Sequence, residues 1–370
     1  MIYLDSAATS LHKPPSVASA MVEAVRNLGN PGRGAHKHAL DAARQVYKGR
    51  KAAASLFDTS PDRVVFTSSA TDSLNIAIRG LLSSTDHVIT TVLEHNSVLR
   101  PLYNLELEIS TIDIRENGDL NYASFENSLK PNTKAVIITS ASNLTGLVVD
   151  MAFVAAFCKR HGLLLIVDAA QTAGLLPISM AEIDVMCFTG HKSLLGPQGV
   201  GGLCTNIDIP PAKFGGSGVD SFSKTQPVKL PESLEAGTLN TPGIAGLAAG
   251  IEYIKATDMA QIYKNSLQLA EAFYNEVLRI ANVKLYCDSL PRAPIVALNI
   301  GDMDSAAVEL CLSNEYGISV RGGAHCAPLL HRSLGTEKQG AVRFSFSSFN
   351  TENDVSAAVQ AVSAIAKESL

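Results

Sequence analysis

The chain has 370 residues, of which 46% are hydrophobic, and it carries a formal net charge of −5 at pH 7. A chain of this size and apolarity can bury one large or two medium cores, which excludes a predominantly disordered protein. The acidic balance gives no overall basic field for nucleic acid, and no apolar run approaches the roughly 20 residues that a membrane-spanning helix requires. The composition therefore favours a small-molecule substrate. No secretory signal is visible in the first residues, so we expect a cytoplasmic protein.

The cysteines indicate neither a disulfide framework nor a structural zinc site, because they are scattered and include no Cys-x-x-Cys pair. His36 and His38 lie too close together for a recognisable metal site, and no third ligand stands at a suitable spacing. All but Cys326 stand in apolar contexts and are expected to be buried, inert thiols. The six cysteines are Cys158, Cys187, Cys204, Cys287, Cys311 and Cys326.

From about residue 40 to residue 205, short β-branched runs alternate with helical stretches, which predicts an α/β domain with a mostly parallel sheet. Helices are predicted over 41–57 and 70–82, where apolar residues recur near the 3.6-residue period and good helix formers dominate. The predicted strands of this sheet cover residues 63–67, 87–92, 135–140, 163–168 and 185–189.

Residues 206–243 are rich in Pro, Gly and Ser, and they predict loops that lead out of the sheet domain. One long helix is predicted to follow at about 243–282. The rest of the chain predicts a smaller α+β domain, whose last helix at 353–368 should bury its apolar face on a second sheet. Strands of the smaller domain are predicted near 293–300, 317–321 and 341–346, around a helix at 305–313. The two predicted domains cover residues 15–245 and, for the smaller one, residues 1–14 and 246–370.

Polar residues end several of the predicted strands. Because functional groups gather beyond the carboxyl ends of parallel strands, we expect Thr67, Ser140, Asp168 and Thr189 near one crevice. Asp168 and Lys192, 24 residues apart, suggest a pyridoxal phosphate site. Its chemistry requires a lysine amine that forms a Schiff base with the cofactor aldehyde and an acid that keeps the pyridine nitrogen protonated. Taken alone, Asp168 could equally cap the next helix, and most lysines are solvated.

Further residues near the strand ends could hold the same cofactor. The amides of Ala70 and Thr71 open a predicted helix, where an anion binds well, although an ordinary capped helix is the simpler alternative. Thr189 and His191 could supply more phosphate donors. His95 follows a strand and could stack on a planar ring, but a core histidine would show the same pattern.

Other side chains could contact the cofactor or the substrate. Gln171 could reach the phenolic oxygen of the cofactor, and Asn143 offers an amide toward the same crevice. Arg343 alternates with apolar residues, and a guanidinium that faces inward requires a carboxylate. That carboxylate could belong to a substrate or to a structural ion pair, and Arg321 carries the same ambiguity.

Cys326 stands in the glycine-rich segment RGGAHCAP, directly after His325. A neighbouring imidazolium can lower a thiol pKa enough to populate the thiolate near neutrality, so Cys326 is a candidate nucleophile. A small hydrophobic residue in a turn is the alternative interpretation.

The segments EHNS, VDAAQTAG, FTGHKSLLGPQGVGGL, EAGTLN, RGGAHCAP and VRFSFSSFNT together resemble cysteine desulfurases of the class V aminotransferase fold, over nearly the whole chain. The cysteine segment is closer to the Suf-type branch than to the Nif/Isc-type branch. The resemblance implies pyridoxal-phosphate-dependent transferase fold type I, a homodimer with the active site at the subunit interface, and a role in sulfur metabolism such as iron–sulfur cluster assembly.

The resemblance also assigns roles to residues of this chain. Lys192 becomes the Schiff-base lysine, Cys326 the persulfide-forming cysteine and Arg343 the arginine for the substrate carboxylate, with Arg321 as a second substrate-side candidate. Thr238 matches the residue that reaches the phosphate from the partner subunit. The implied cofactor-binding residues are Ala70, Thr71, His95, Asn143, Asp168, Gln171, Thr189, His191, Lys192 and Thr238, and the implied catalytic residues are Lys192, Cys326 and His95.

The chain departs from the family pattern in places. Thr189 stands where the family usually has serine, and Ala324 precedes His325 where well-known Suf-type members carry a second histidine. The segment 30–36 resembles a substrate-side loop of the family, to which we assign no role.

The implied reaction converts L-cysteine to L-alanine and passes the sulfur through a persulfide to an acceptor protein. Lys192 takes the α-proton, and the Cys326 thiolate attacks the substrate sulfur. Selenocysteine lyase is the first alternative, followed by another class V aminotransferase, epimerase or lyase. A cofactor-free scaffold or thiol-binding module on the same fold is the alternative outside the enzymes.

Overall fold

The computed structural model describes residues 1–32, 34–286 and 292–369. Cys287 and Arg33, which is part of the segment 30–36, lie outside the described residues.

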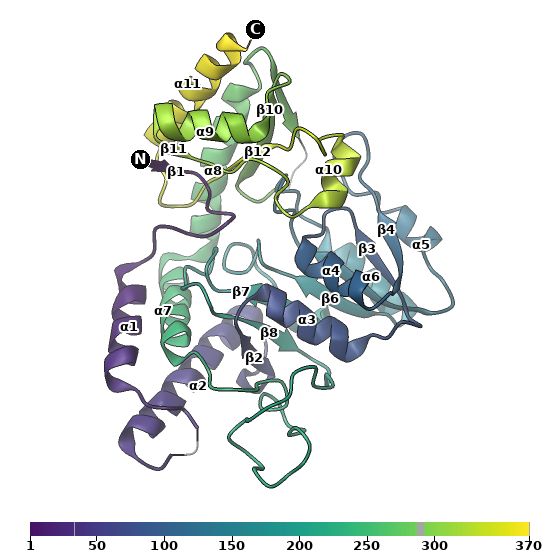
Figure 1. Cartoon of the computed structure of the whole chain (residues 1–370), viewed down its shortest axis with the longest axis vertical. Helices are drawn as coiled ribbons and strands as arrows, with labels where there is room; N and C mark the ends of the chain where they lie inside the picture. Colours follow the sequence, from purple (N-terminus) through teal and green to yellow (C-terminus); the bar gives the residue numbers. More distant parts are fainter. Residues whose placement is uncertain (33, 287–291, 370) are drawn as a thin grey trace.

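A seven-stranded sheet forms the centre of the larger part of the molecule (Figure 1). Its strand order is β2-β8-β7-β6-β5-β3-β4, and β8 alone runs antiparallel to its neighbours. The predicted α/β architecture with a mostly parallel sheet is confirmed. The strands are β2 (Val64–Thr67), β3 (His87–Thr91), β4 (Glu108–Ile112), β5 (Thr133–Thr139), β6 (Leu164–Asp168), β7 (Val185–Thr189) and β8 (Gly201–Thr205).

Helices cover both faces of this sheet, because the strands carry apolar side chains on both faces. On β5, Ala135 and Ile137 join one hydrophobic core with α3 and α4, whereas Val136 and Ile138 join another with α2, α6 and α7. The helices before and around the sheet are α1 (Pro15–Asn27), α2 (Lys37–Phe57), α3 (Ala70–Leu81), α4 (Asn96–Asn104), α5 (Ser124–Asn127), α6 (Met151–His161) and α7 (Thr241–Thr257), with short 3₁₀ turns at Pro61–Arg63 and Met180–Glu182.

The C-terminal part contains an antiparallel sheet of order β12-β10-β9 and a separate parallel pair, β1-β11. The last helix shares a core with this sheet through Val362 and Ile365, packed with Leu298 and Phe344, which confirms its predicted position. The elements are β1 (Ile2–Tyr3), α8 (Met259–Val277), β9 (Val283–Tyr286), β10 (Ile295–Ile300), α9 (Ser305–Tyr316), β11 (Ile318–Ser319), α10 (Pro328–Leu334), β12 (Val342–Ser345) and α11 (Glu352–Glu368).

The prediction of one helix over 243–282 is wrong, because the chain breaks at Asp258. This residue has a φ of 74°, and its carboxylate accepts a hydrogen bond from the Ala260 amide at 3.1 Å, so it caps α8. α7 contacts α1 and α2, whereas α8 contacts α11 and β10. The predicted domain boundary at residue 245 therefore falls inside α7, and the division stays a prediction.

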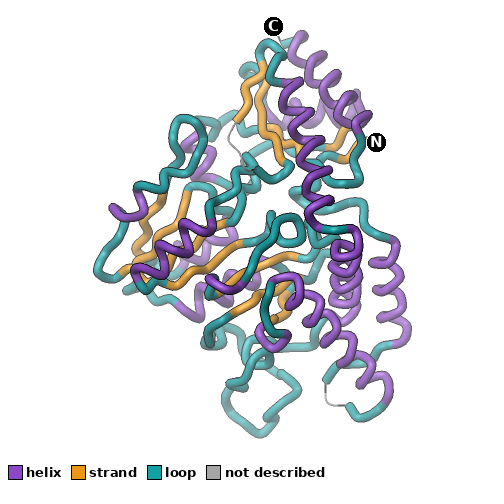
Figure 2. Tube along the Cα trace, turned by 180° about the vertical axis from the view of Figure 1, so that it is seen from behind, coloured by secondary structure: helices purple, strands orange, loops and turns teal. Residues whose placement is uncertain are grey.

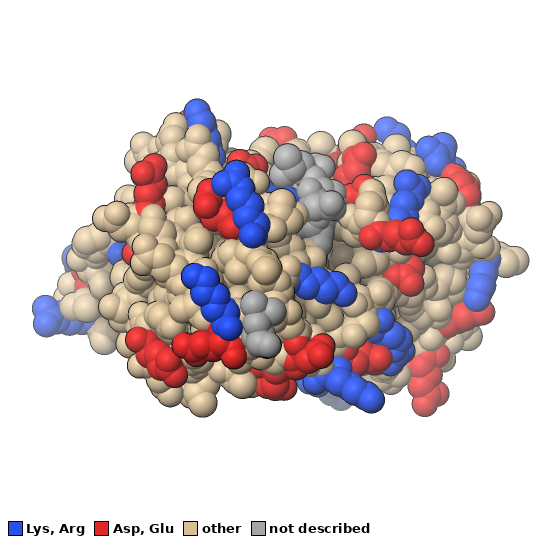
Figure 3. All heavy atoms as spheres, turned by 90° about the horizontal axis from the view of Figure 1, so that it is seen from above, with Lys and Arg blue, Asp and Glu red and all other residues tan. Residues whose placement is uncertain are grey.

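Residues 206–240 contain no helix or strand, which confirms the predicted loops, and they project from the end of the molecule opposite the C-terminal sheet (Figures 1 and 2). On the face in Figure 3, basic and acidic side chains are interspersed without a large field of one sign. No helix in the described part of the chain is long and apolar enough to cross a membrane.

Candidate active site

A cavity of about 210 Å³ lies where the carboxyl ends of β6 and β7 meet residues from both ends of the chain. Two predicted site residues, Thr238 and Cys326, are not part of its described lining. The predicted residues that line it together are Ala70, Thr71, His95, Asn143, Asp168, Gln171, Thr189, His191, Lys192, Arg321 and Arg343.

The expectation that four strand ends share one crevice is only half right. Asp168 and Thr189 end β6 and β7 and line the cavity. Thr67 lines a different cavity, and its hydroxyl donates to the carbonyl of Ser69, which lines this one. The Ser140 hydroxyl forms a hydrogen bond with the Thr172 hydroxyl at 2.5 Å. Thr139 lines the cavity in its place.

Asp168 and Lys192 form the electrostatic centre of the cavity. The Asp168 carboxylate is buried and accepts a hydrogen bond from the Ala170 amide at 2.9 Å; burial raises its pKa, and Lys192 opposes that rise. Burial also lowers the pKa of Lys192 to about 8, helped by Arg343 and Arg321 and opposed by Asp168. An amine with this pKa is partly neutral near pH 8, as a nucleophile and a proton acceptor must be.

The lowered pKa of Lys192 predicts the pH dependence of cofactor capture. The amine loses its proton as pH rises through about 8, so the rate of covalent capture of pyridoxal phosphate by cofactor-free protein should rise about tenfold from pH 7 to 9 and then level off. Stopped-flow absorbance measures this rate. Asp168→Asn, which removes a charge that raises the lysine pKa, should move the midpoint to lower pH. A rate that does not change between pH 7 and 9 would contradict the assignment.

His95 is a neutral ring at the N-cap position of α4. Its Nδ1 accepts a hydrogen bond from the Ser97 amide at 3.0 Å and contacts the Ser97 hydroxyl at 2.8 Å, so the ring proton belongs on Nε2. Burial, with the positive charges of Lys192 and Arg321, lowers the pKa of His95 to about 4. Ser97 also contacts Thr71 Oγ1 at 2.7 Å and thereby links the ring to the start of α3. A flat, uncharged ring in this position suits contact with a planar ligand.

One end of the cavity is built to receive an anion. Ala70 and Thr71 form the first turn of α3, whose amides lack partners within the helix. The buried Thr189 hydroxyl and His191 Nδ1 have no hydrogen-bond partner among the described residues. Buried polar atoms are nearly always bonded, so these two indicate a missing polar ligand. The residues present therefore fit a phosphate group.

Asn143 and Gln171 tie separate segments to the cavity wall. Asn143 Nδ2 donates to the His325 carbonyl at 2.7 Å, and its Oδ1 is buried with no partner among the described residues. Gln171 Nε2 donates to the Ala7 carbonyl at 3.2 Å. Part of the hydrogen-bonding capacity of each amide thus holds the protein together, and the rest is free for a ligand.

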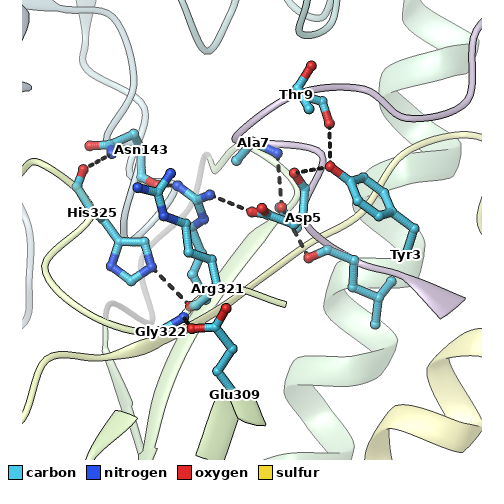
Figure 4. A network of polar contacts seen from close by, with 12 residues as sticks. Tyr3, Asp5, Ala7, Thr9, Asn143, Glu309, Arg321, Gly322 and His325 are labelled. Atoms are coloured by element: carbon cyan, nitrogen blue, oxygen red, sulfur yellow. Dashed lines mark hydrogen bonds and ion pairs between the residues drawn. The ribbon is translucent and has the colours of Figure 1, made fainter. Parts of the chain in front are cut away.

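The two predicted substrate arginines are neighbours on paired backbone segments. The Arg343 amide donates to the Arg321 carbonyl at 2.8 Å. Arg343 is 1% exposed, and its Nη2 forms an ion pair with Asp5 Oδ1 at 2.7 Å, while Nη1 donates to the Asn143 carbonyl at 2.8 Å. Arg321 is exposed, and its side chain has no ion pair among the described residues (Figure 4). Both predicted roles of Arg343 thus remain open, since it lines the cavity and forms an ion pair.

Cys326 stands in a strained turn beside the cavity. His325 and Cys326 have φ values of 50° and 55°, and the left-handed region costs roughly 1–2 kcal/mol for each residue other than glycine. The turn is held by Asn143, which binds the His325 carbonyl, and by the Asn96 amide, which donates to the Cys326 carbonyl at 2.8 Å. The thiol is partly exposed, and its neighbour His325 lines the cavity.

The expectation that His325 is an imidazolium beside Cys326 is wrong. Burial, followed by the positive charge of Arg343, lowers the pKa of His325 to about 3, so the ring is neutral at physiological pH. Its Nε2 donates to the Arg321 carbonyl at 3.0 Å, which leaves Nδ1 without a proton. His325 therefore brings no positive charge to the thiol.

Thr238 lies outside this cavity. It lines a separate hollow of about 600 Å³ together with Tyr47 and Arg50. The segment before it is anchored by Glu235, whose carboxylate forms a buried ion pair with Arg50 at 2.5 Å and accepts the Phe66 amide at 2.7 Å. Its assigned contact with a partner's phosphate stays a prediction.

Several residues at the site were not among the predicted site residues. Asp5 reaches Arg343 across 338 positions of sequence, and Ala7 lines the cavity from the same N-terminal segment. Glu94 is fully buried beneath the site; its Oε1 accepts hydrogen bonds from Thr91 and Thr139, and burial raises its pKa to about 8. Glu94 directly precedes His95, and that adjacency was the one clue available.

The described residues contain no group of three or more His, Cys, Asp or Glu side chains that could hold a metal ion.

Comparison with known proteins gives one consistent family. Residues 2–358 match the aminotransferase class-V family model. A probable cysteine desulfurase from Methanothermobacter thermautotrophicus is 32% identical, over 96% of this chain and 92% of that protein. The apo structure of a cysteine desulfurase from Thermococcus onnurineus NA1 superposes with a TM-score of 0.91 at 29% identity, covering 99% of this chain and 95% of that one. The cysteine desulfurase CsdA (S-sulfonic acid) from Escherichia coli gives a TM-score of 0.88 at 28% identity, covering 100% and 95%.

Proposed function

The chain belongs to the class V aminotransferase family and is a cysteine desulfurase, and on that premise we propose that Lys192, Arg343 and Cys326 carry its reaction on L-cysteine. The observation that carries this proposal is the position of Lys192. Its amine, with a pKa lowered to about 8, shares one cavity with the buried Asp168 and the two arginines.

The residues of the cavity fit pyridoxal phosphate. The first turn of α3, Thr189 and His191 would hold the phosphate, and the unpaired Thr189 and His191 atoms support this. Asp168 would hold a proton at the pyridine nitrogen, and His95 would contact the ring. When bound, the cofactor supplies an electron-withdrawing ring that stabilises negative charge on the α-carbon of the substrate.

The protein's own side chains would then act in sequence. Arg343 and Arg321 bind the carboxylate of L-cysteine, and the neutral Lys192 amine takes the proton from its α-carbon. The Cys326 sulfur attacks the substrate sulfur, the carbon–sulfur bond of the substrate breaks, and Cys326 keeps the sulfur as a persulfide. The electron pair of the broken carbon–sulfur bond stays with the three-carbon fragment, which takes up one proton at its β-carbon and regains one at its α-carbon to leave as L-alanine, so no added oxidant is needed.

The assignment of Arg343 has a direct kinetic test. Arg343→Lys keeps the charge and loses the planar fork that binds a carboxylate through two hydrogen bonds, so KM for L-cysteine should rise at least about tenfold with a smaller loss in kcat. Arg332→Lys, an exposed position on α10, is the control and should behave as wild type. Steady-state release of alanine and sulfide in the presence of reductant gives both constants, and an unchanged KM in Arg343→Lys would refute the role.

We also propose a homodimer, in which Thr238 contributes to the partner's phosphate site. Support comes from the exposed apolar side chains Leu40, Tyr47 and Phe214, which lie on α2 and the 206–240 loop, because Tyr47 lines the same hollow as Thr238. A protein that accepts the sulfur, iron–sulfur cluster assembly as the pathway and a cytoplasmic location complete the proposal.

A further inference from the structure

The first residues of the chain form one wall of the active site. β1 pairs with β11, the Leu4 amide donates to the Ser319 carbonyl at 2.8 Å, and the Ser345 amide donates to the Leu4 carbonyl at 2.7 Å. Farther along, Ala7 lines the cavity. Residues 2–7 thus run as a strap past β12, the strand that carries Arg343.

This strap delivers one carboxylate to the site. Asp5 Oδ1 lies 2.7 Å from Arg343 Nη2, and the Asp5 side chain is 18% exposed. Its backbone is held on one side by the bridge to Ser345 and on the other by Tyr3, whose hydroxyl donates to the Asp5 carbonyl at 3.2 Å and the Thr9 carbonyl at 2.8 Å (Figure 4). These backbone contacts fix the position of Asp5 beside Arg343.

Arg343 and Asp5 differ in what they can touch. Arg343 lines the cavity, whereas Asp5 is absent from the described lining. The Nε of Arg343 is buried and has no partner among the described residues, so this side chain still has a donor to offer. A ligand carboxylate can thus meet Arg343 directly and would feel Asp5 only through it.

We infer that Asp5 is a resident counter-ion that sets how strongly the site binds the carboxylate of its substrate. This inference rests on the proposed role of Arg343. Asp5 acts through Arg343 and is a positioning residue. Without it, the guanidinium would be a buried charge with no compensation, which is strongly unfavourable in a folded protein.

The charges explain why the counter-ion weakens binding. Asp5 offsets the charge of Arg343, so of the two arginines it is Arg321, exposed and without an ion pair among the described residues, whose positive charge is left to attract a carboxylate. An incoming carboxylate on another nitrogen of Arg343 would lie roughly 7 Å from Asp5. At an effective dielectric constant of about 20, repulsion between two negative charges at that distance lowers affinity by at least about tenfold.

A purely structural role for Asp5 predicts the opposite sign. If Asp5 served only to orient Arg343, its loss would misplace the guanidinium and weaken carboxylate binding. If Asp5 is a counter-ion, Asp5→Asn leaves an acceptor of the same shape, removes the negative charge and tightens carboxylate binding. The sign of the change therefore separates the two roles.

The test measures propionate, a simple monocarboxylate, on the full-length protein. Thermal shift gives its dissociation constant, and competition against L-cysteine in the cofactor-loaded enzyme gives an independent value. In Asp5→Asn we expect at least about tenfold tighter propionate binding, a lower KM for L-cysteine, and a lower melting temperature without ligand that propionate restores. Asp5→Glu, which keeps the charge, should recover wild-type affinity.

Two further variants make each outcome decisive. Tyr3→Phe removes the hydroxyl that holds the strap and keeps the Asp5 charge, so its propionate affinity should match wild type. Arg343→Lys should weaken propionate binding at least about tenfold; if it does not, the proposed role of Arg343 fails, whatever Asp5 does. Unchanged or weaker propionate binding in Asp5→Asn overturns the counter-ion role, and so would an Asp5→Asn protein that stays insoluble at every propionate concentration.

Discussion

Lys192→Ala is expected to lower L-cysteine desulfuration by at least about 10³-fold and to abolish covalent attachment of the cofactor. Lys192 is the only lysine in the described lining of the cavity, and burial lowers its pKa to about 8, so in that lining its amine alone can form a Schiff base with the cofactor. Thr189 and His191, which we propose as phosphate contacts, stay in place, so the variant should still bind the cofactor without a covalent bond.

The visible spectrum and the alanine release rate measure both effects on one sample. Lys51→Ala, on the exposed side of α2, is the matched control and should keep the absorbance band and the activity of the wild type. A Lys192→Ala protein that still captures the cofactor covalently would show that another lysine holds it.

Cys326→Ala should have a comparable effect through a different step. Substrate would still bind and lose its α-proton, but no sulfur nucleophile would remain. Sulfide and alanine release should therefore fall by at least about 10³-fold, while the visible absorbance band of the bound cofactor is retained. Cys311→Ala, a partly buried thiol on α9, is the control and should retain full activity.

The outcome also distinguishes this reaction from others on the same fold. An aminotransferase or epimerase does not need a thiol at position 326, so activity that survives in Cys326→Ala would exclude the assigned nucleophile. Loss of colour together with activity would instead mean that the substitution disturbed the turn, in which Cys326 has a φ of 55°.

The central strands could be predicted because strands covered on both faces are continuous apolar runs. β6 and β7 were found within one residue of their bounds for this reason. β8 and β4 were missed, since β8 begins with two glycines and β4 alternates polar residues at the sheet edge. The break at Asp258 was missed because only this one residue leaves the helical conformation, and the apolar pattern on both sides of it is helical.

The candidate site was predictable where local sequence places a residue at a strand end or at the start of a helix. Asp168 and Thr189 end β6 and β7, and Lys192 follows the end of β7 by three residues. Asp5 could not be predicted in this way, because its partner Arg343 is 338 positions away and no motif near either residue indicates the ion pair. The neutral charge state of His325 could not be predicted from the sequence either, because it depends on burial that only the fold creates.

The most direct test of the account is the mass of the peptide that contains Cys326 after the cofactor-loaded protein meets L-cysteine without reductant. We expect this peptide to gain the mass of one sulfur atom in step with the release of one alanine, and the gain to disappear on addition of reductant. Alanine release with no added sulfur on Cys326, or with the sulfur on another cysteine, would contradict the assignment of Cys326 as the sulfur acceptor.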